Sequence, residues 1–295
     1  MGRELAEASP VARATFAQGD DLLGIPLSRL AWEGPEAELN DTINTQPALM
    51  VHSVAVLRTF EERYPGFTPA YTAGHSMGEL SALVAAGALP YTDALRLARR
   101  RGELMKRAGE ISPGGMAAIL GLDIPTLEEI CAAASTADET VQVANDNCPG
   151  QVVISGARPA LERAVQLAQA AKARRAVVLA VSIAAHSPLM RNAQDDFNHA
   201  VDSAPLADPR IPLIANITAL PMRSRVEVRT DLQAQLNSRV RWTESVQYMI
   251  AQGVRNFIEL GSGSVLCGLI KRIDREADCY SIGTPGDFEK LDEGN

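Results

Sequence analysis

The feature that most constrains this chain is a serine set between two glycines, in Gly74-His75-Ser76-Met77-Gly78. Small residues precede the motif and a helix-forming run follows it, so Ser76 is expected on a sharp strand-to-helix turn, the context of a nucleophile elbow. Both glycines are expected to be required, since a Cβ at Gly74 or Gly78 would press on crowded backbone. The following helix would point its free N–H groups at an oxyanion. The alternative is a chance glycine-serine turn.

Composition excludes several classes of protein. Hydrophobic residues make up 46% of the 295 residues and charged residues 22%, which predicts a packed core rather than disorder. A net charge of −8 argues against a nucleic-acid-binding protein. There is no run of eighteen apolar residues and no charged-then-apolar leader, so we expect a soluble cytoplasmic protein with no membrane contact.

The cysteines indicate neither a metal site nor a disulfide framework. Cys131, Cys148, Cys267 and Cys279 are scattered and form no C-x-x-C pair. We expect all four to be buried or unreactive thiols.

The order of predicted elements indicates an α/β fold with an insertion. Between residues 114 and 181 the pattern reads β-α-β-β-α-β, which is typical of a ferredoxin-like α+β subdomain. On either side, residues 1–113 and 182–295 alternate helices with strands and predict one α/β core. A strand at 69–74 leads into the elbow, and further strands are expected at 211–216 and 256–260. The tail from Gly283 is expected to be polar and frayed.

One of the four histidines is placed to act as a base toward Ser76. His186 follows a predicted strand and precedes Ser187-Pro188, so it lies at a strand end, where α/β sheets place their sites. The other three are expected to pack or to face solvent: His52, His75 and His199.

The sequence of the elbow is Gly-His-Ser-Met-Gly-Glu followed by residues 81–87. It resembles the corresponding segment of the malonyl-CoA:acyl-carrier-protein transacylases and of the related acyltransferase domains of polyketide synthases. The resemblance continues at residues 44–49, 181–190 and 241–273, in the family's order, and so covers nearly the whole chain. It implies a hydrolase-like parallel-sheet core with the ferredoxin-like subdomain inserted into it.

The resemblance implies a Ser-His dyad. Ser76 matches the nucleophile, and residues 181–190 match the segment that carries the catalytic histidine, here His186. We find no aspartate that sequence alone would name as a third member. In the family a backbone carbonyl orients the histidine, and the matching residue is Gln235. The alternative for Gln235 is an ordinary glutamine at a helix end.

Arg101 matches the family's arginine before glycine, in Arg99-Arg100-Arg101-Gly102. A guanidinium fork binds a carboxylate with two hydrogen bonds, as a malonyl group requires. An acetyl group would leave that fork buried and unpaired, so charge would supply the selectivity. The alternative is a solvated basic helix face, which is what we expect for Arg99 and Arg100.

The chain departs from the family at two places. The family opens with a strand and a Gly-Gln-Gly-Ser-Gln loop that supplies the second oxyanion donor, whereas this chain begins at the Met-Gly that normally follows. We therefore expect the first strand to be missing, an open slot beside the elbow strand, and the N–H of Met77 as the remaining donor. Ala185 stands where related enzymes often carry phenylalanine, which predicts a wider acyl pocket.

The implied activity is a ping-pong transfer of malonyl from malonyl-CoA to the phosphopantetheine thiol of acyl carrier protein, with no cofactor and no metal. A monomer is expected. Carrier proteins are acidic as a class, so a basic surface is needed, with these candidates: Lys172, Arg174, Arg175, Arg191, Lys271 and Arg272. The alternatives are a serine thioesterase or hydrolase, and an N-terminally truncated, weakly active or non-catalytic homologue. The pathway, fatty acid or polyketide, stays open.

Overall fold

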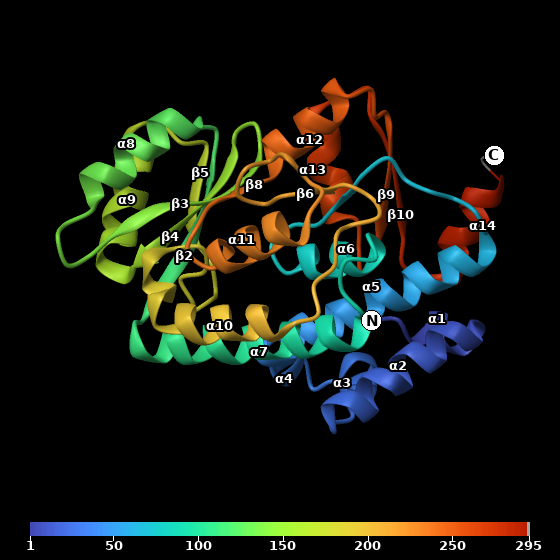
Figure 1. Cartoon of the computed structure of the whole chain (residues 1–295). Helices are drawn as coiled ribbons and strands as arrows, with labels where there is room; N and C mark the ends of the chain where they lie inside the picture. Colours follow the sequence, from blue (N-terminus) through green and yellow to red (C-terminus); the bar gives the residue numbers. More distant parts are fainter. Residues whose placement is uncertain (294–295) are drawn as a thin grey trace.

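The computed structural model describes residues 1–293 as a mixed α/β fold (Figure 1). The first two helices are separated at Ser9, whose Oγ accepts the N–H of Ala12 and so caps the second helix. The elements of the N-terminal third are α1 (Arg3–Ala8), α2 (Pro10–Leu23), α3 (Leu27–Glu33), α4 (Glu36–Leu39), α5 (Thr42–Arg63), β1 (Thr72–Ala73), α6 (Gly78–Ala85) and α7 (Tyr91–Ile111).

Helix α5 contains a proline that neighbouring groups accommodate. The helix begins at Thr42 because the carboxylate of Asp41 accepts the N–H of Ile43 at 3.1 Å. Pro47 lies inside the helix and cannot donate to the carbonyl of Ile43, four residues earlier. Arg99 on α7 donates to that carbonyl at 3.4 Å instead. Because of the proline, the carbonyl of Ile43 can accept from Arg99, and this hydrogen bond links α5 to α7.

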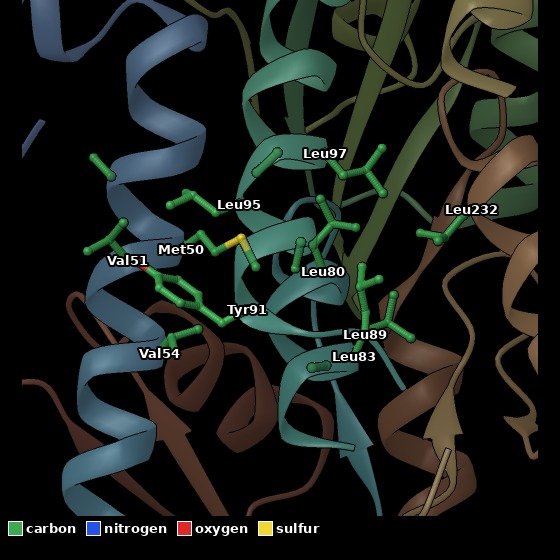
Figure 2. Close-up of a cluster of buried hydrophobic side chains, with 14 of the residues drawn as sticks. Met50, Val51, Val54, Leu80, Leu83, Leu89, Tyr91, Leu95, Leu97 and Leu232 are labelled. Atoms are coloured by element: carbon green, nitrogen blue, oxygen red, sulfur yellow. The ribbon is translucent and has the colours of Figure 1, made fainter. Parts of the chain in front are cut away.

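The main apolar core lies between α5, α6 and α7 (Figure 2). Each helix contributes a stripe of buried aliphatic side chains, and Tyr91 lies among them with its hydroxyl donating to the carbonyl of Thr15 at 3.1 Å. The labelled members of this cluster are Met50, Val51, Val54, Leu80, Leu83, Leu89, Tyr91, Leu95, Leu97 and Leu232. This packing fixes the position of α6, and with it the turn that carries Ser76.

The strands outside the middle of the chain form two small sheets. Strand β1 pairs in parallel with β6 (Leu213–Ile214), and β7 (Pro221–Met222) adds to β6 in the antiparallel sense. Strands β9 (Asn256–Leu260) and β10 (Asp278–Ile282) form a separate parallel pair. Within residues 1–293 no strand other than β6 pairs with β1. The expectations of a missing first strand and of an open slot beside the elbow strand stay predictions.

A larger sheet is formed by the middle of the chain. Its elements are β2 (Gly114–Leu120), α8 (Ile124–Ala134), β3 (Val141–Cys148), β4 (Gln151–Ala157), α9 (Arg158–Ala170) and β5 (Arg175–Val178). The strand order is β5-β2-β4-β3, and all three of these pairings are antiparallel. This is the arrangement that the β-α-β-β-α-β pattern predicts. Both helices bury their apolar faces in a cluster that belongs to this unit.

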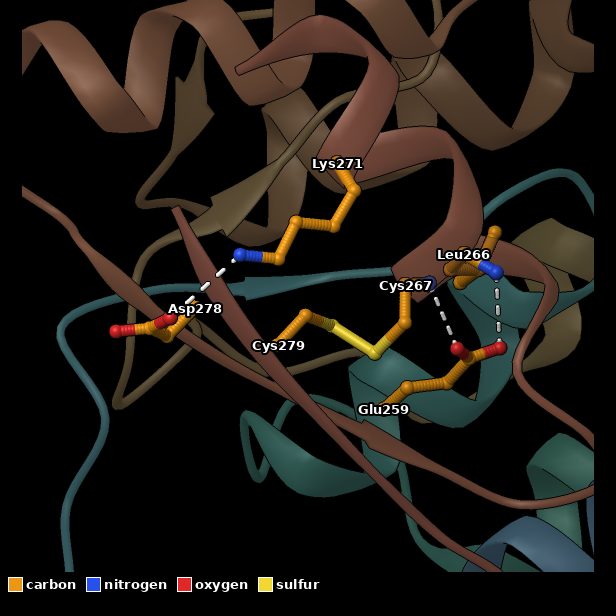
Figure 3. The surroundings of a disulfide bond; sticks show 6 residues. All are labelled: Glu259, Leu266, Cys267, Lys271, Asp278 and Cys279. Carbon is orange, nitrogen blue, oxygen red and sulfur yellow. Dashed lines mark hydrogen bonds and ion pairs between the residues drawn. A yellow bond between two sulfur atoms is a disulfide. The ribbon is translucent and has the colours of Figure 1, made fainter. Parts of the chain in front are cut away.

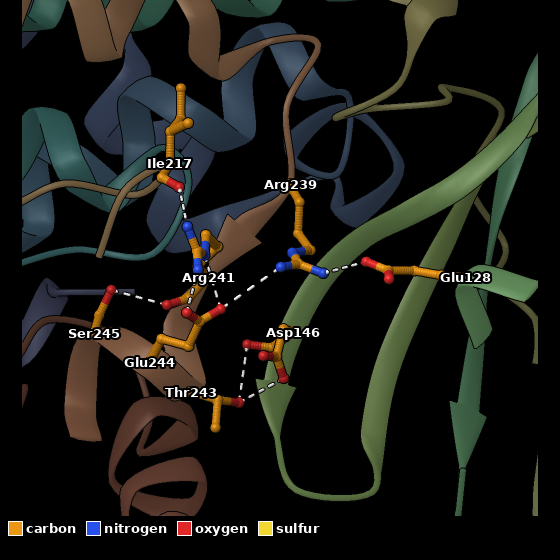
Figure 4. Close-up of polar contacts among 8 residues, drawn as sticks. All are labelled: Glu128, Asp146, Ile217, Arg239, Arg241, Thr243, Glu244 and Ser245. Atoms are coloured by element: carbon orange, nitrogen blue, oxygen red, sulfur yellow. Dashed lines mark hydrogen bonds and ion pairs between the residues drawn. The ribbon is translucent and has the colours of Figure 1, made fainter. Parts of the chain in front are cut away.

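A fifth strand, β8 (Val240–Arg241), joins this sheet from far along the chain and was not expected. It pairs in parallel with β3, and the backbone N–H of Arg241 also donates to the carbonyl of Asn216 at 2.8 Å. Side chains reinforce the joint (Figure 4): Thr243 donates to Asp146 at 2.6 Å, and Arg239 pairs with Glu128 at 2.9 Å. The sheet is thereby attached to the segment that follows β6.

The C-terminal third is mostly helical, and its tail is packed. Its helices are η1 (Pro188–Met190), α10 (Arg191–Ser203), α11 (Arg225–Gln235), α12 (Trp242–Ala251), α13 (Val265–Ile273) and α14 (Pro285–Glu293). The expectation of a frayed tail from Gly283 is wrong. Asp287 accepts the N–H of Thr284 at 2.9 Å and holds the start of α14, and Phe288 is 1% exposed in the main core.

The expectation of four free thiols is wrong for two of the cysteines. Cys267 on α13 and Cys279 on β10 are joined in a disulfide (Figure 3). They are brought together because α13 packs against the β9–β10 pair. Cys131 and Cys148 are free and buried, as expected. In the part of the chain that the structure describes, no helix is long and apolar enough to cross a membrane.

Candidate active site

The elbow turn places Ser76 in the left-handed region, with φ +53°. A non-glycine residue there is strained, as expected of a residue held for its chemistry. Gly74 is required, because a Cβ on it would lie 2.1 Å from the carbonyl of Gly78. The expectation for Gly78 is wrong: a Cβ there meets nothing within 4 Å, since the crowding falls on the strand side of the turn.

Ser76 and His186 are 110 residues apart in sequence and meet in the structure. The Oγ of Ser76 lies 2.8 Å from Nε2 of His186, and Nδ1 of His186 lies 2.9 Å from the backbone carbonyl of Gln235. A carbonyl can only accept, so Nδ1 carries the proton and Nε2 is left to accept from the serine hydroxyl. The contact expected between His186 and Gln235 is present.

Two amides that the sequence analysis missed hold the backbone around this pair. Asn216, just after β6, accepts the N–H of Ser76 at 2.8 Å and donates to the carbonyl of Gly74 at 2.8 Å. Gln142 on β3 donates to the carbonyl of His186 at 2.7 Å. His186 is itself left-handed, with φ +58°, so its loop needs such support. Asn216 ends the strand expected at 211–216, and that position was the available signal.

Arg101 on α7 is buried against the serine. Its side chain donates to Gln46 at 2.8 Å, to the side-chain oxygen of Gln235 at 2.9 Å and to Ser76 Oγ at 3.1 Å. Its Nε is buried with no partner among the described residues. Gly102 allows this placement, because a Cβ there would lie 2.6 Å from the carbonyl of Thr42 where α7 crosses the start of α5. The N–H at Nε is therefore left for a further acceptor.

Of the neighbouring arginines, Arg100 is solvated as the sequence predicted, with a side-chain exposure of 44% near Glu103 and Asp196. Arg99 differs from the prediction: it is partly buried, pairs with Glu103 at 2.8 Å and donates to Asn44 at 3.0 Å, so it lies between α7 and α5.

The side chains of the remaining three histidines form hydrogen bonds elsewhere and not with the hydroxyl of Ser76. His75 turns toward β3, where Nε2 lies 2.8 Å from the side-chain oxygen of Asn147, and its ring packs on Trp242. His52 is buried between Ser262 and the carbonyl of Gly283. His199 lies on the surface of α10, with Nδ1 2.8 Å from the carbonyl of Asp195.

Burial and charge determine the protonation of the site. Burial lowers the pKa of His186 to about 3, and the positive charge of Arg101 lowers it further in the same direction. Burial also lowers the pKa of Arg101 to about 10, against the charge of Glu79, which raises it. At neutral pH the imidazole is therefore neutral and the guanidinium charged.

Met77 is the N-cap of α6, and its backbone N–H donates no hydrogen bond to the described residues. The three amides that follow it are used within the turn, by the carbonyls of His75, Ser76 and Met77. No acceptor for Met77 N–H is found among residues 1–293. In the same described part of the chain, no group of three or more His, Cys, Asp or Glu side chains could hold a metal ion.

Comparison with known proteins gives a consistent result. The family model described as acyl transferase domain matches residues 1–284. A malonyl CoA-acyl carrier protein transacylase of Bacillus subtilis (strain 168) is 43% identical over 289 residues, which cover 98% of this chain and 90% of the relative. One from Haemophilus influenzae (strain ATCC 51907 / DSM 11121 / KW20 / Rd) is 41% identical over 293 residues, covering 99% and 94%.

Solved structures agree with this comparison. The malonyl CoA-acyl carrier protein transacylase of Coxiella burnetii superposes with a TM-score of 0.95 at 36% identity, covering 99% of this chain and 92% of that one. A malonyl-transacylase solved in complex with its type II polyketide synthase acyl carrier protein gives a TM-score of 0.96 at 40% identity, covering 100% and 95%.

The electrostatics of the site predict how the pKa of His186 responds to Arg101. In Arg101→Ala, loss of the positive charge should raise that pKa by about one unit or more. In Arg101→Lys, which keeps the charge, the pKa should stay low. Histidine-labelled NMR titration measures it, with His186→Ala used to assign the signal. An unchanged pKa in Arg101→Ala would show that burial alone sets it.

Proposed function

The chain belongs to the acyl transferase domain family, and on this premise we propose that it transfers a malonyl group from malonyl-CoA to the phosphopantetheine thiol of an acyl carrier protein. The observation that carries the proposal is the contact of one buried arginine, Arg101, with the hydroxyl of Ser76 at 3.1 Å. This contact places the proposed nucleophile beside a group that binds carboxylates. One short acyl chain, attached to Ser76, could therefore reach the guanidinium with its far end.

In the first half-reaction Ser76 is the nucleophile. Its Oγ attacks the thioester carbonyl carbon of malonyl-CoA while its proton passes to Nε2 of His186, 2.8 Å away. The carbon–sulfur bond then breaks, and the CoA sulfur takes that proton as it leaves. Malonyl remains as an ester on Ser76.

The second half-reaction reverses these roles. The carrier's phosphopantetheine thiol gives its proton to Nε2 of His186, and its sulfur attacks the ester carbonyl. The bond from that carbon to Ser76 Oγ breaks, and the oxygen recovers the proton. The backbone carbonyl of Gln235 holds the imidazole in the required tautomer throughout, through its 2.9 Å contact with Nδ1.

In both halves a negative charge develops on the acyl oxygen. The N–H of Met77 follows the nucleophile directly and has no acceptor within the described residues, so it is available as an oxyanion donor. The first turn of α6 adds its positive dipole end.

Arg101 supplies the selectivity for malonyl. Its Nε has no partner in the described part of the protein, and a malonyl carboxylate would satisfy it. The same carboxylate would offset the positive charge that lowers the pKa of His186. The substrate that fits the arginine therefore also strengthens the base, whereas an acetyl group does neither.

We also propose that residues 114–181 form a subdomain inserted into a hydrolase-like core made of residues 1–113 and 182–295. The buried apolar cluster of residues 117–168 is separate from the main core cluster, which supports this division. The site lies at the junction, since Ser76 and Arg101 come from the core and Gln142 from the subdomain.

The surface proposed to receive the carrier is a basic groove. It has a volume of about 350 Å³ and is lined by Pro149, Gly150, Arg174, Lys271, Arg272 and Arg275. Lys271 lies 3.5 Å from Asp278, and Arg272 contacts Gln151, whereas Arg174 and Arg275 have no acidic partner among residues 1–293. Concentrated positive charge on a protein of net charge −8 suits an acidic partner. The earlier candidates Lys172, Arg175 and Arg191 do not line the groove.

The nucleophile is tested with Ser76→Ala. This variant should form no malonyl-enzyme adduct, detected by mass spectrometry after mixing with malonyl-CoA, because among residues 1–293 no other hydroxyl is hydrogen-bonded to His186 Nε2. Ser81→Ala, on helix α6 just after the elbow turn, is the matched control and should acylate normally. In the wild type, malonyl-CoA alone should give one burst of CoA and no further turnover until carrier protein is added. Steady CoA release without carrier would indicate a hydrolase instead.

The selectivity is tested with Arg101→Ala. Malonyl transfer should fall by roughly a hundredfold or more, while the use of acetyl-CoA relative to malonyl-CoA rises, because the buried charge no longer requires a carboxylate. Arg101→Lys should also be poor, since an ammonium cannot form the two-pronged contact. Arg100→Ala is the control. If the malonyl-to-acetyl preference of Arg101→Ala matches the wild type, Arg101 does not read the carboxylate.

The groove is tested by charge reversal. Arg174→Glu and Arg275→Glu should each raise the KM for carrier protein by roughly fivefold to tenfold, with the effect weakening at high salt. The burst of malonyl-enzyme formation should be unchanged, since CoA reaches Ser76 without the carrier. Arg191→Glu, outside the groove, is the matched control. Equal KM values for all three variants would place the carrier elsewhere.

A further inference from the structure

Two buried acids lie next to the site and take no part in the transfer described above. Glu79 is 0% exposed in the first turn of α6, and Asp231 is 6% exposed on α11. Glu79 ends the Gly-His-Ser-Met-Gly-Glu motif, three residues after Ser76. Burying two carboxyl groups against each other is costly unless a proton or a cation compensates them. Their placement therefore needs a physical reason.

We propose that Glu79 and Asp231 share one proton and act together as a positioning unit for the nucleophile and the base. They act through two amide residues, Asn216 and Gln235. The inference rests on the proposed acyl transfer for its consequence, but not for the shared proton itself.

The first connection runs to the nucleophile. An oxygen of Glu79 accepts the backbone N–H of Asn216 at 3.2 Å. The side chain of Asn216 in turn accepts the N–H of Ser76 and donates to the carbonyl of Gly74, each at 2.8 Å. Glu79 thus fixes the residue that clamps both sides of the elbow turn.

The second connection runs to the base and the arginine. The other oxygen of Glu79 accepts a hydrogen bond from the side-chain nitrogen of Gln235. This sets which end of the amide is the oxygen, and that oxygen accepts from Arg101 at 2.9 Å. The backbone carbonyl of the same glutamine holds His186. Without an acceptor at Glu79, the amide is free to turn.

The shared proton follows from the remaining acceptors. One oxygen of Asp231 accepts the N–H of Ile217 at 3.2 Å, while Oδ2 is buried without a donor in the described part of the chain. Burial and the neighbouring charge of Asp231 raise the pKa of Glu79 well above its usual range, and burial raises that of Asp231. A protonated Glu79 can donate to the unpartnered oxygen.

The charge balance supports a single proton. The charged group that faces the pair is Arg101 on α7, and His186 beside it is neutral. One proton leaves the pair with one negative charge, which matches the one positive charge of the guanidinium. Two protons would leave Arg101 uncompensated, and none would leave an excess buried anion.

Infrared spectroscopy tests the proton without any activity measurement. With isotopically labelled glutamate, the wild-type protein at neutral pH should show the C=O band of one buried carboxylic acid, and Glu79→Gln should remove it. Asp146→Asn is the control, because Asp146 is the other buried acid whose pKa is raised. A neutral-pH spectrum without such a band overturns the shared proton.

Kinetics test the positioning role. Glu79→Gln turns an N–H toward Gln235 instead of an acceptor, so kcat should fall by roughly tenfold or more while the KM for malonyl-CoA stays within about twofold. Asp231→Asn replaces the shared proton by an N–H donor toward Glu79 and leaves that acid ionised opposite Arg101, so kcat should fall by clearly less than in Glu79→Gln. Thermal melting is recorded for both variants.

The outcomes separate this inference from the proposed function. Wild-type protein that never forms a malonyl-enzyme contradicts the function but leaves the infrared result standing. A Glu79→Gln variant with wild-type kcat, or an Asp231→Asn variant as impaired as Glu79→Gln, overturns the positioning unit. If Glu79→Gln does not fold, the infrared band and the rate of Asp231→Asn still decide the question.

Discussion

The site depends on one buried glutamine at the end of α11. The backbone carbonyl of Gln235 holds the imidazole of His186, and its side-chain oxygen holds Arg101. Its side-chain nitrogen donates to the carbonyl of Ser76 at 3.2 Å and to Glu79. One residue therefore sets the spacing of Ser76, the imidazole of His186 and the guanidinium of Arg101. Each of its polar groups is used, so a small displacement of α11 would disturb all three contacts together.

Burial is the second constraint, and it acts on protonation. An imidazole and a guanidinium are held close to one hydroxyl, 2.8 Å and 3.1 Å from Ser76 Oγ. With little water to screen them, the two cannot both be charged, so the imidazole remains neutral and able to accept a proton. The positive charge that remains needs an anion. Part of the compensation comes from the acid pair behind the site, and a substrate carboxylate would supply more.

The five-stranded sheet and the helical core meet at this site. Gln142 reaches from β3 to the carbonyl of His186, and β8 pairs with β3 while its backbone also contacts Asn216. His186 hydrogen-bonds the hydroxyl of Ser76, and Asn216 holds the backbone of the elbow turn. A shift of the five-stranded sheet relative to the helical core would therefore displace groups around Ser76, although no described residue of that sheet hydrogen-bonds the serine hydroxyl.

The amino-acid sequence by itself was enough for the features that depend on local patterns. The elbow follows from Gly74 and the helix after it, the β-α-β-β-α-β order follows from periodicity and turns, and the resemblance to the acyltransferases pointed to Ser76, His186 and Arg101. Tertiary structure decided what depends on pairing between distant segments. Asn216, Gln142 and Gln46 reach the site only after folding, and the same holds for strand β8, the Cys267–Cys279 disulfide and the packing of Phe288. A polar side chain or a lone cysteine carries no local signal of its partner, because the partner is chosen by how helices and sheets pack.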